Sequence, residues 1–116
     1  MKKKHPVYHW NFIDLDGISL SDFLKHLLDL PWENILDPAY KDFKTSSSES
    51  TGRYIFQLIS AADDELIAAI DADQFQNNNL HIHTRWRPDM TVFPDKIVKW
   101  LHENFTVTHC NFHPTR

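Results

Sequence analysis

The feature that most constrains the fold is a stretch of alternating residues between Arg53 and Trp86. In its last run, Leu80–Trp86, each apolar residue or threonine is followed by a histidine or an arginine. Neighbouring side chains of a strand point to opposite faces, so this run is typical of a strand with one buried face. The first run, Arg53–Ser60, is rich in aromatic and β-branched residues. We therefore predict a meander of three antiparallel strands, against which the other elements pack.

The middle run of the meander is open to two interpretations. Ser60, with Asp63 three residues later, could begin an alanine-rich helix that runs to Phe75. Alternatively, Ala61–Asp64 is a suitable hairpin loop, because the residues after it alternate as in a strand. We favour the strand, in which one face would carry Leu66, Ala68, Ile70 and Ala72.

The flanking segments predict two helices and two further strands. Aromatic residues at every second position predict a strand over Pro6–Asp14. The apolar stripe of Ser19–Leu30 predicts a helix, and Pro94 suits the first turn of another helix that ends at Asn104. A β-rich run, Thr106–Phe112, closes the chain as a strand. The predicted order is β-α-β-β-β-α-β.

The connection between the first helix and the meander is less regular. Short helical turns are expected within Trp32–Leu36 and Pro38–Phe43, and the polar run Thr45–Gly52 is predicted to be a flexible loop. Because helices interrupt the strands only twice, the sheet should be mostly antiparallel with the helices on one face. This is an α+β fold, a two-layer sandwich.

Length and charge limit the class of protein. A chain of 116 residues predicts a single domain, residues 1–116, with a basic tail at residues 1–5. The one cysteine cannot form an internal disulfide and no apolar run is long enough for a membrane span, so we expect a cytoplasmic protein. The formal net charge of −4 disfavours nucleic-acid binding and favours a basic protein partner.

A short motif suggests an alternative function. Residues 12–17 have the sequence Phe-Ile-Asp-Leu-Asp-Gly. This run resembles the first motif of the haloacid-dehalogenase-like phosphohydrolases. The resemblance implies a doubly wound fold and a magnesium-dependent hydrolase, with Asp14 as the phosphoryl-accepting nucleophile and Asp16 as a general acid/base. Two departures are that Ile18 replaces the motif's threonine, and that no lysine lies between Ser60 and Asp63, the residues that could represent the later motifs.

The histidines suggest a second way in which the chain could be a metal-dependent hydrolase. His81 and His83 lie two residues apart on a predicted strand, so both point to one face. They could bind a metal ion if His109 of the last strand came within a bonding distance of about 2.0–2.2 Å. Otherwise they are solvated residues of the open face, beside Arg85. No third ligand is fixed by spacing, so we expect no cofactor.

A single-stranded nucleic-acid binder is another alternative. Such proteins combine aromatic platforms with a positive groove. Trp86, however, falls on the face opposite Arg85, which places it in the core. The residues of this basic-aromatic patch would be Tyr54, His81, His83, Arg85, Trp86 and Arg87.

The absence of a strong catalytic signature favours a protein-binding module over an enzyme. We expect it to inhibit or neutralise a basic protein partner, as toxin-immunity proteins and phage or plasmid inhibitors do. A homodimer through a free sheet edge is also expected. The candidate partner contacts are Asp63, Asp64, Glu65, Asp71, Asp73, His81, His83 and Arg85.

Overall fold

The computed structural model describes residues 8–40, 42–76 and 78–112, and these contain six strands and three α-helices. The predicted tail at residues 1–5 lies outside the described residues. In chain order the elements are β1 (His9–Asp16), α1 (Leu20–Leu28), α2 (Trp32–Ile35), a 3₁₀ turn (Pro38–Tyr40), β2 (Phe43–Ser50), β3 (Arg53–Ser60), β4 (Leu66–Gln76), β5 (Asn79–Trp86), α3 (Val92–Asn104) and β6 (Thr106–Cys110).

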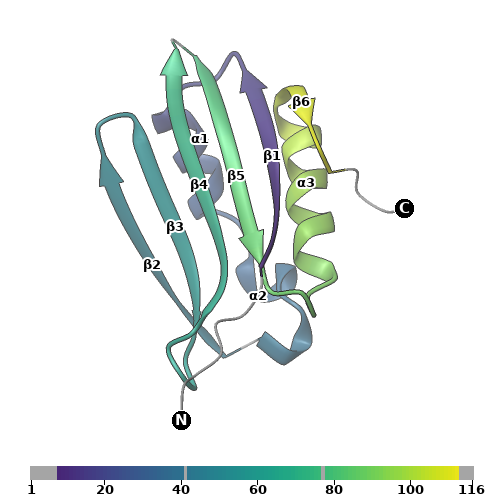
Figure 1. The fold of residues 1–116 in the computed structure, drawn as a ribbon. Helices are drawn as coiled ribbons and strands as arrows, with labels where there is room; N and C mark the ends of the chain where they lie inside the picture. The colour runs from purple at the N-terminus through teal and green to yellow at the C-terminus, as the bar shows by residue number, and fades with distance from the viewer. Residues whose placement is uncertain (1–7, 41, 77, 113–116) are drawn as a thin grey trace.

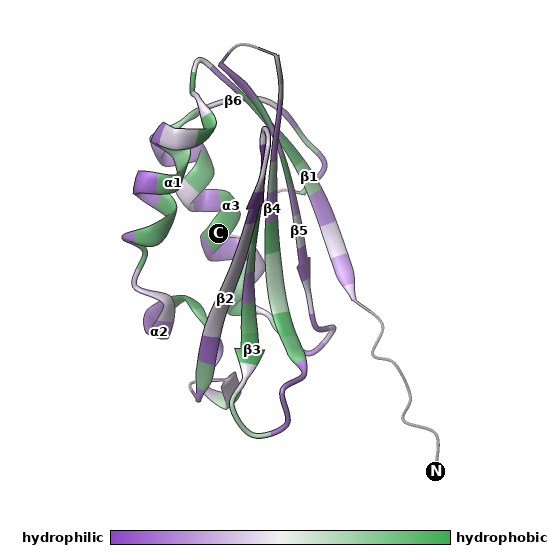
Figure 2. Cartoon of the chain, turned by 90° about the vertical axis from the view of Figure 1, so that its left-hand side faces the viewer, coloured by the Kyte–Doolittle hydropathy of each residue, from purple (hydrophilic) through white to green (hydrophobic). Residues whose placement is uncertain are grey.

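The six strands form one sheet with the order β2-β3-β4-β5-β1-β6, and every neighbouring pair is antiparallel. The helices lie on one side of this sheet (Figures 1 and 2). The first strand of the chain is therefore an interior strand between β5 and β6. The predicted α+β class, with an antiparallel sheet and helices on one face, agrees with this arrangement.

The predicted order of elements is wrong at β2. Thr45–Gly52, predicted as a flexible loop, forms most of this strand and the turn that follows it. β2 pairs with β3 along its whole length, from Phe43 opposite Ser60 to Ser50 opposite Arg53. Its polar side chains are almost all exposed, so the strand has no apolar face that periodicity could detect. Backbone pairing with β3, rather than burial, holds it in place.

The strand interpretation of the middle run is confirmed by β4. β4 pairs with β3 on one side and β5 on the other, and these two ladders outweigh the helical propensity of its alanines. The loop before β4 has the predicted position, and Asp64 in it has a φ of 59°. Aspartate tolerates this left-handed conformation better than most residues do.

The core fills the space between the inner face of the sheet and the helices. The four residues of β5 that were predicted to face inward are buried, with exposed fractions of 0% for Leu80, Ile82 and Thr84 and 5% for Trp86. The helices contribute a matching set of fully buried side chains. These are Phe23 and Leu27 of α1 and Phe93, Ile97, Val98 and Leu101 of α3.

The start of α3 is capped by a residue that is distant in the sequence. The Asp37 carboxylate accepts hydrogen bonds from the backbone N–H groups of Thr91, at 3.1 Å, and Val92, at 3.2 Å. It also accepts one from the Thr91 hydroxyl at 3.1 Å. The first N–H groups of a helix have no partner within the helix and lie at its positive end, so a carboxylate there stabilises the helix. Asp37 thereby fixes α3 to the segment that follows α2.

One polar pair lies within the apolar core. Thr84 of β5 donates a hydrogen bond from Oγ1 to Asn11 Oδ1 of β1 at 2.5 Å, and both residues are at most 1% exposed. Asn11 Nδ2 is buried and has no partner among the described residues. A buried donor without an acceptor costs free energy, so this pair is a weak point of the core.

We expect the pair to show strong coupling in stability measurements. Thr84→Val removes the donor and leaves the Asn11 amide without a partner, which should lower the free energy of unfolding by about 1–3 kcal/mol. Adding Asn11→Leu makes both positions apolar and should restore stability to within about 1 kcal/mol of the parent protein. Urea unfolding of the parent, both single variants and the double variant measures this coupling. Additive losses in the double variant would contradict the expectation.

Candidate functional site

The sheet face opposite the helices, called the open face below, brings together charged, histidine and aromatic side chains from several strands. Residues that pair directly across antiparallel strands point to the same face, so the strand registers define rows of side chains across it. The three central rows are Arg53, Asp73, His81, Asp14 and His109; Ile55, Asp71, His83 and Phe12; and Gln57, Ala69, Arg85 and Trp10.

Arg53 forms ion pairs with two carboxylates of the open face, and His81 contacts Asp14 in the first row. Arg53 Nε lies 3.2 Å from Asp73 Oδ1, and Arg53 Nη2 lies 3.7 Å from Asp71 Oδ2 in the next row. His81 Nδ1 lies 2.6 Å from Asp14 Oδ1. Arg53 and Arg85 offset part of the carboxylate charge in these rows, so the open face carries both signs.

Two aromatic residues of β1 lie on the open face against two histidines of β5. The ring centroids of Trp10 and Phe12 are 4.7 Å apart, and Phe12 lies 5.3 Å from His81 and 5.0 Å from His83. Trp10 also contacts His83, with centroids 6.0 Å apart. We call Trp10, Phe12, His81 and His83 the aromatic–histidine cluster. Trp10 remains 53% exposed, which is unusual for so large an apolar side chain.

The sequence pattern placed Trp10 and Phe12 on one face of the first strand but did not assign them to the site. The signal that could have assigned them lies in the residues that alternate with them along the same strand. Asn11, Ile13 and Leu15 are almost completely buried beneath the helices, so the aromatic residues must lie on the other face.

Asp71 is the most buried carboxylate of the open face. It lies in the middle row, beside Ile55 of β3 and His83 of β5, and only 8% of its surface is exposed. Its Oδ2 atom faces Arg53, but its Oδ1 atom is buried and has no hydrogen-bond donor among the described residues. Buried carboxylate oxygens normally accept hydrogen bonds, so this atom requires an explanation.

His83 gives the open face a dependence on pH. Burial lowers the pKa of His83 below its usual value of 6.5 and outweighs the opposite effect of Asp71, while Arg85 and His81 lower it further. The native protein thus holds His83 neutral at a pH at which the unfolded chain takes up the proton.

We expect stability to fall as the pH drops below 6.5, because the proton then binds the unfolded state more tightly. This contribution is fully present above that pH and is lost as the pH falls toward the lower pKa of the folded state. Urea midpoints from about pH 5 to about pH 8 measure it, and His83→Gln should flatten the curve. The matched control is His109→Gln, a change at an exposed residue of β6. Equal slopes for all three proteins would contradict the assignment to His83.

The five acidic candidates fall into two groups rather than one. Asp71 and Asp73 lie on the open face. Asp63, Asp64 and Glu65 lie at the β3–β4 hairpin, at the end of the sheet (Figure 1). Asp64 pairs with Lys44 at 2.5 Å, and Asp63 Oδ1 accepts a hydrogen bond from the Glu65 backbone at 3.1 Å. The hairpin group therefore has local structural roles of its own.

The three candidate histidines lie on two strands of the sheet. His81 and His83 share the open face, as predicted, and His109 of β6 lies in the row of His81, on the far side of Asp14. Within residues 8–40, 42–76 and 78–112, no three histidine, cysteine, aspartate or glutamate side chains are grouped to hold a metal ion. The geometry therefore gives no support to the metal alternative.

The fold implied by the phosphohydrolase resemblance is not the observed one. That family has a doubly wound parallel sheet, whereas every strand pair here is antiparallel. Asp14 pairs with His81, and Asp16 ends β1 before Gly17, which turns the chain with a φ of 78°. A cavity of about 340 Å³ lies beside both aspartates, lined by Asp14, Leu15, Asp16, Asn79 and Thr108.

The proposed nucleic-acid patch is divided between the two faces of the sheet. Trp86 and Tyr54 are buried on the inner face, 5% and 7% exposed, as expected for Trp86. Arg87 is held by the Leu66 carbonyl, which accepts a hydrogen bond from its Nε at 2.8 Å, and lies over the Tyr40 ring. Only His81, His83 and Arg85 of that patch remain on the open face.

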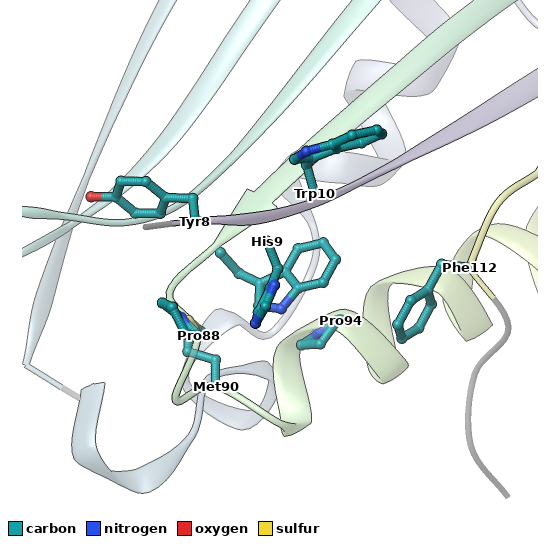
Figure 3. Close-up of a pocket in the computed structure, with 8 residues that line it drawn as sticks. Tyr8, His9, Trp10, Pro88, Met90, Pro94 and Phe112 are labelled. Carbon is teal, nitrogen blue, oxygen red and sulfur yellow. The ribbon is translucent and has the colours of Figure 1, made fainter. Parts of the chain in front are cut away.

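A hollow of about 500 Å³ adjoins Trp10 at the end of the sheet where β1 begins (Figure 3). Its walls are of mixed polarity and come from β1, the end of β5, the start of α3 and the residues after β6. They are Tyr8, His9, Trp10, Trp86, Pro88, Met90, Pro94 and Phe112.

The two outer strands of the sheet are β2 and β6. The homodimer expected through a free edge stays a prediction, and β2 is the longer edge, with eight residues against five. Sedimentation velocity over a range of concentrations tests it. None of the helices in the described part of the chain is long and apolar enough to cross a membrane.

Comparison with known proteins does not assign a relative. No family model, no curated protein and no solved structure matches the chain. The candidate site is therefore identified by its geometry alone.

Proposed function

We propose that this protein is a small binding module that docks a protein partner against the open face of its sheet, with Trp10 at the centre of the contact. The observation that carries the proposal is the exposure of Trp10 within the aromatic–histidine cluster. Tryptophan and arginine are enriched among the residues that dominate binding energy in protein interfaces. Here Trp10 lies beside Arg85, its direct partner across the β1–β5 ladder.

The open face suits a protein better than a nucleic acid. Its central rows contain three carboxylates, those of Asp14, Asp71 and Asp73, close to the aromatic rings. Such carboxylates would repel a phosphate backbone, which binds through clustered lysine and arginine. The mixture of aromatic, arginine and carboxylate groups is typical of a protein interface.

Charge supports a basic partner. The net charge of −4 would steer a basic protein toward this chain, and binding of such a partner is the basis of the inhibitory or neutralising role that we propose. The exposed carboxylates of Asp63 and Asp64 would extend the contact at the hairpin end of the sheet. The lone cysteine, a free thiol in the structure, is consistent with an intracellular location as part of this proposal.

Affinity capture from the native cell tests the proposal. The tagged parent protein should retain a specific partner, and Trp10→Ala should release it. A charge-reversed hairpin, with Asp63, Asp64 and Glu65 all changed to lysine, should weaken the capture less than Trp10→Ala does, because these residues lie at the edge of the proposed contact. Recovery of the same partner by the parent and the Trp10→Ala variant in equal amounts would refute the open face as the docking surface.

A further inference from the structure

We infer that the open face recognises its partner by seating one cationic side chain, an arginine or a lysine, on Asp71 beside the aromatic–histidine cluster. This inference rests on the proposed function and names the chemistry by which the partner is anchored. Three observations support it: the state of the Asp71 carboxylate, the rings beside it and the distribution of charge around it.

The Asp71 carboxylate can accept a further hydrogen bond. Oδ1 is buried and has no hydrogen-bond donor among the described residues, while Oδ2 has only the distant Arg53 guanidinium at 3.7 Å. That separation is too long for a hydrogen bond, so neither oxygen is well satisfied within the chain. The Asp71 side chain is 11% exposed, so an incoming guanidinium or ammonium would reach the carboxylate from the open face. Once the carboxylate turns about its Cβ–Cγ bond, Oδ1 would accept a charge-assisted hydrogen bond from it.

The rings next to Asp71 suit the rest of such a side chain. His83 pairs directly with Asp71, and Phe12 pairs directly with His83, so carboxylate, imidazole and phenyl ring follow one another across three adjacent strands. Long cationic side chains bury their methylene groups on apolar surfaces while the charged end reaches a polar partner. The faces of Phe12 and Trp10 also attract cations directly.

The neighbouring charges favour a cation at this point over an anion. Asp73 flanks Asp71 on β4, and Asp14 lies in the adjacent row of β1, so three carboxylates surround the aromatic–histidine cluster. Arg53 is already engaged by two of them. Arg85, in the row on the other side, remains to meet an acidic group of the same partner.

Short peptides that differ in one side chain test this inference. The probes are Gly-Gly-X-Gly-Gly with blocked termini, in which X is arginine, lysine or citrulline, a neutral isostere of arginine. Each is titrated into the full chain labelled with ¹⁵N, and binding is followed at the Trp10 indole and the amides of Asp71 and His83. The arginine or lysine peptide should shift these signals, and citrulline should bind at least tenfold more weakly.

Two matched variants identify the carboxylate. Asp71→Asn keeps the size of the side chain and should weaken binding of the cationic peptide at least tenfold. Asp29→Asn removes an equal charge from the exposed end of α1, in the helical layer on the other side of the sheet, and should leave binding unchanged. Equal binding of citrulline and arginine peptides, no binding of any peptide, or an unchanged affinity in Asp71→Asn would overturn the inference. The citrulline comparison uses the parent protein, so it holds even if Asp71→Asn folds poorly.

The outcomes separate this inference from the proposed function. If partner capture depends on Trp10 but neither peptide binding nor partner binding depends on Asp71, the docking face is supported and the cation site is wrong. If inorganic phosphate or a short single-stranded oligonucleotide shifts the same signals and the cationic peptides do not, the ligand is an anion and the inference is wrong.

Discussion

Replacement of Trp10 by alanine should weaken partner binding about 30- to 1,000-fold, which corresponds to about 2–4 kcal/mol. Trp10 is 53% exposed and lies on the face that no helix covers, so its removal takes little from the core. It does remove a large rigid surface from the centre of the proposed contact, together with the support that its ring gives to Phe12 and His83. Titration calorimetry with the captured partner measures the loss.

The matched control for this prediction is Leu28→Ala. Among the residues that the structure describes, Leu28 of α1 is the other large apolar residue that is strongly exposed, at 59%, and it belongs to the helical layer on the opposite side of the sheet. Its removal should leave affinity unchanged. Similar losses for the two variants would mean that general surface hydrophobicity, rather than the open face, drives the association. A phenylalanine at position 10 should retain part of the affinity, because it keeps an aromatic surface.

Removal of the Asp37 carboxylate should give the largest loss of stability among the polar substitutions considered. Asp37→Ala deletes bonds to the backbone of Thr91 and Val92 and to the Thr91 hydroxyl. Asp37 is only 9% exposed, so water cannot replace its bonds fully. Capping contributes about 0.5–2 kcal/mol, and charge-assisted buried bonds contribute more, so we expect a loss of about 2–3 kcal/mol. The melting temperature should fall by about 10 °C.

Two further variants show whether the cap is the cause. Asp37→Asn keeps an acceptor but removes the charge at the positive end of α3, and should lose about half as much as the alanine variant. Asp42→Ala removes a carboxylate that is exposed, only five positions further along the chain, and should change stability by less than about 0.5 kcal/mol. Thermal unfolding followed by circular dichroism compares the three variants. Equal losses for Asp37→Ala and Asp42→Ala would contradict the capping role.

Much of the fold could be predicted where one periodic pattern dominates. The alternation of Leu80–Trp86 predicted both the strand β5 and its buried residues correctly. β2 could not be predicted, because Ser46, Ser47 and Ser48 carry no apolar alternation and are held by pairing with β3. The cap of α3 was likewise missed, since Asp37 and Thr91 meet across 54 positions of sequence.

The candidate site could be predicted only in part, for a related reason. The alternation of side chains along Leu80–Trp86 predicted that His81, His83 and Arg85 share one outward face, and this is where they lie. Which side of the first strand joins that face depends on the β1–β5 register, which pairs Trp10 with Arg85 and Phe12 with His83. The buried state of Asp71 depends on the same long-range pairing. Sequence periodicity describes one strand at a time and does not contain this information.

The interior position of β1 has a consequence for how the chain folds during synthesis. The meander from β2 to β5 joins consecutive segments and can form as they leave the ribosome, whereas β1 must wait for β5 and then for β6. Closing the pair Asp14 and His109 joins residues 95 positions apart, and such distant closures slow folding. Before β5 is made, the nascent chain therefore exposes β1 without a partner, and until β6 is made one edge of β1 stays unpaired. Chaperones would be needed most during this interval.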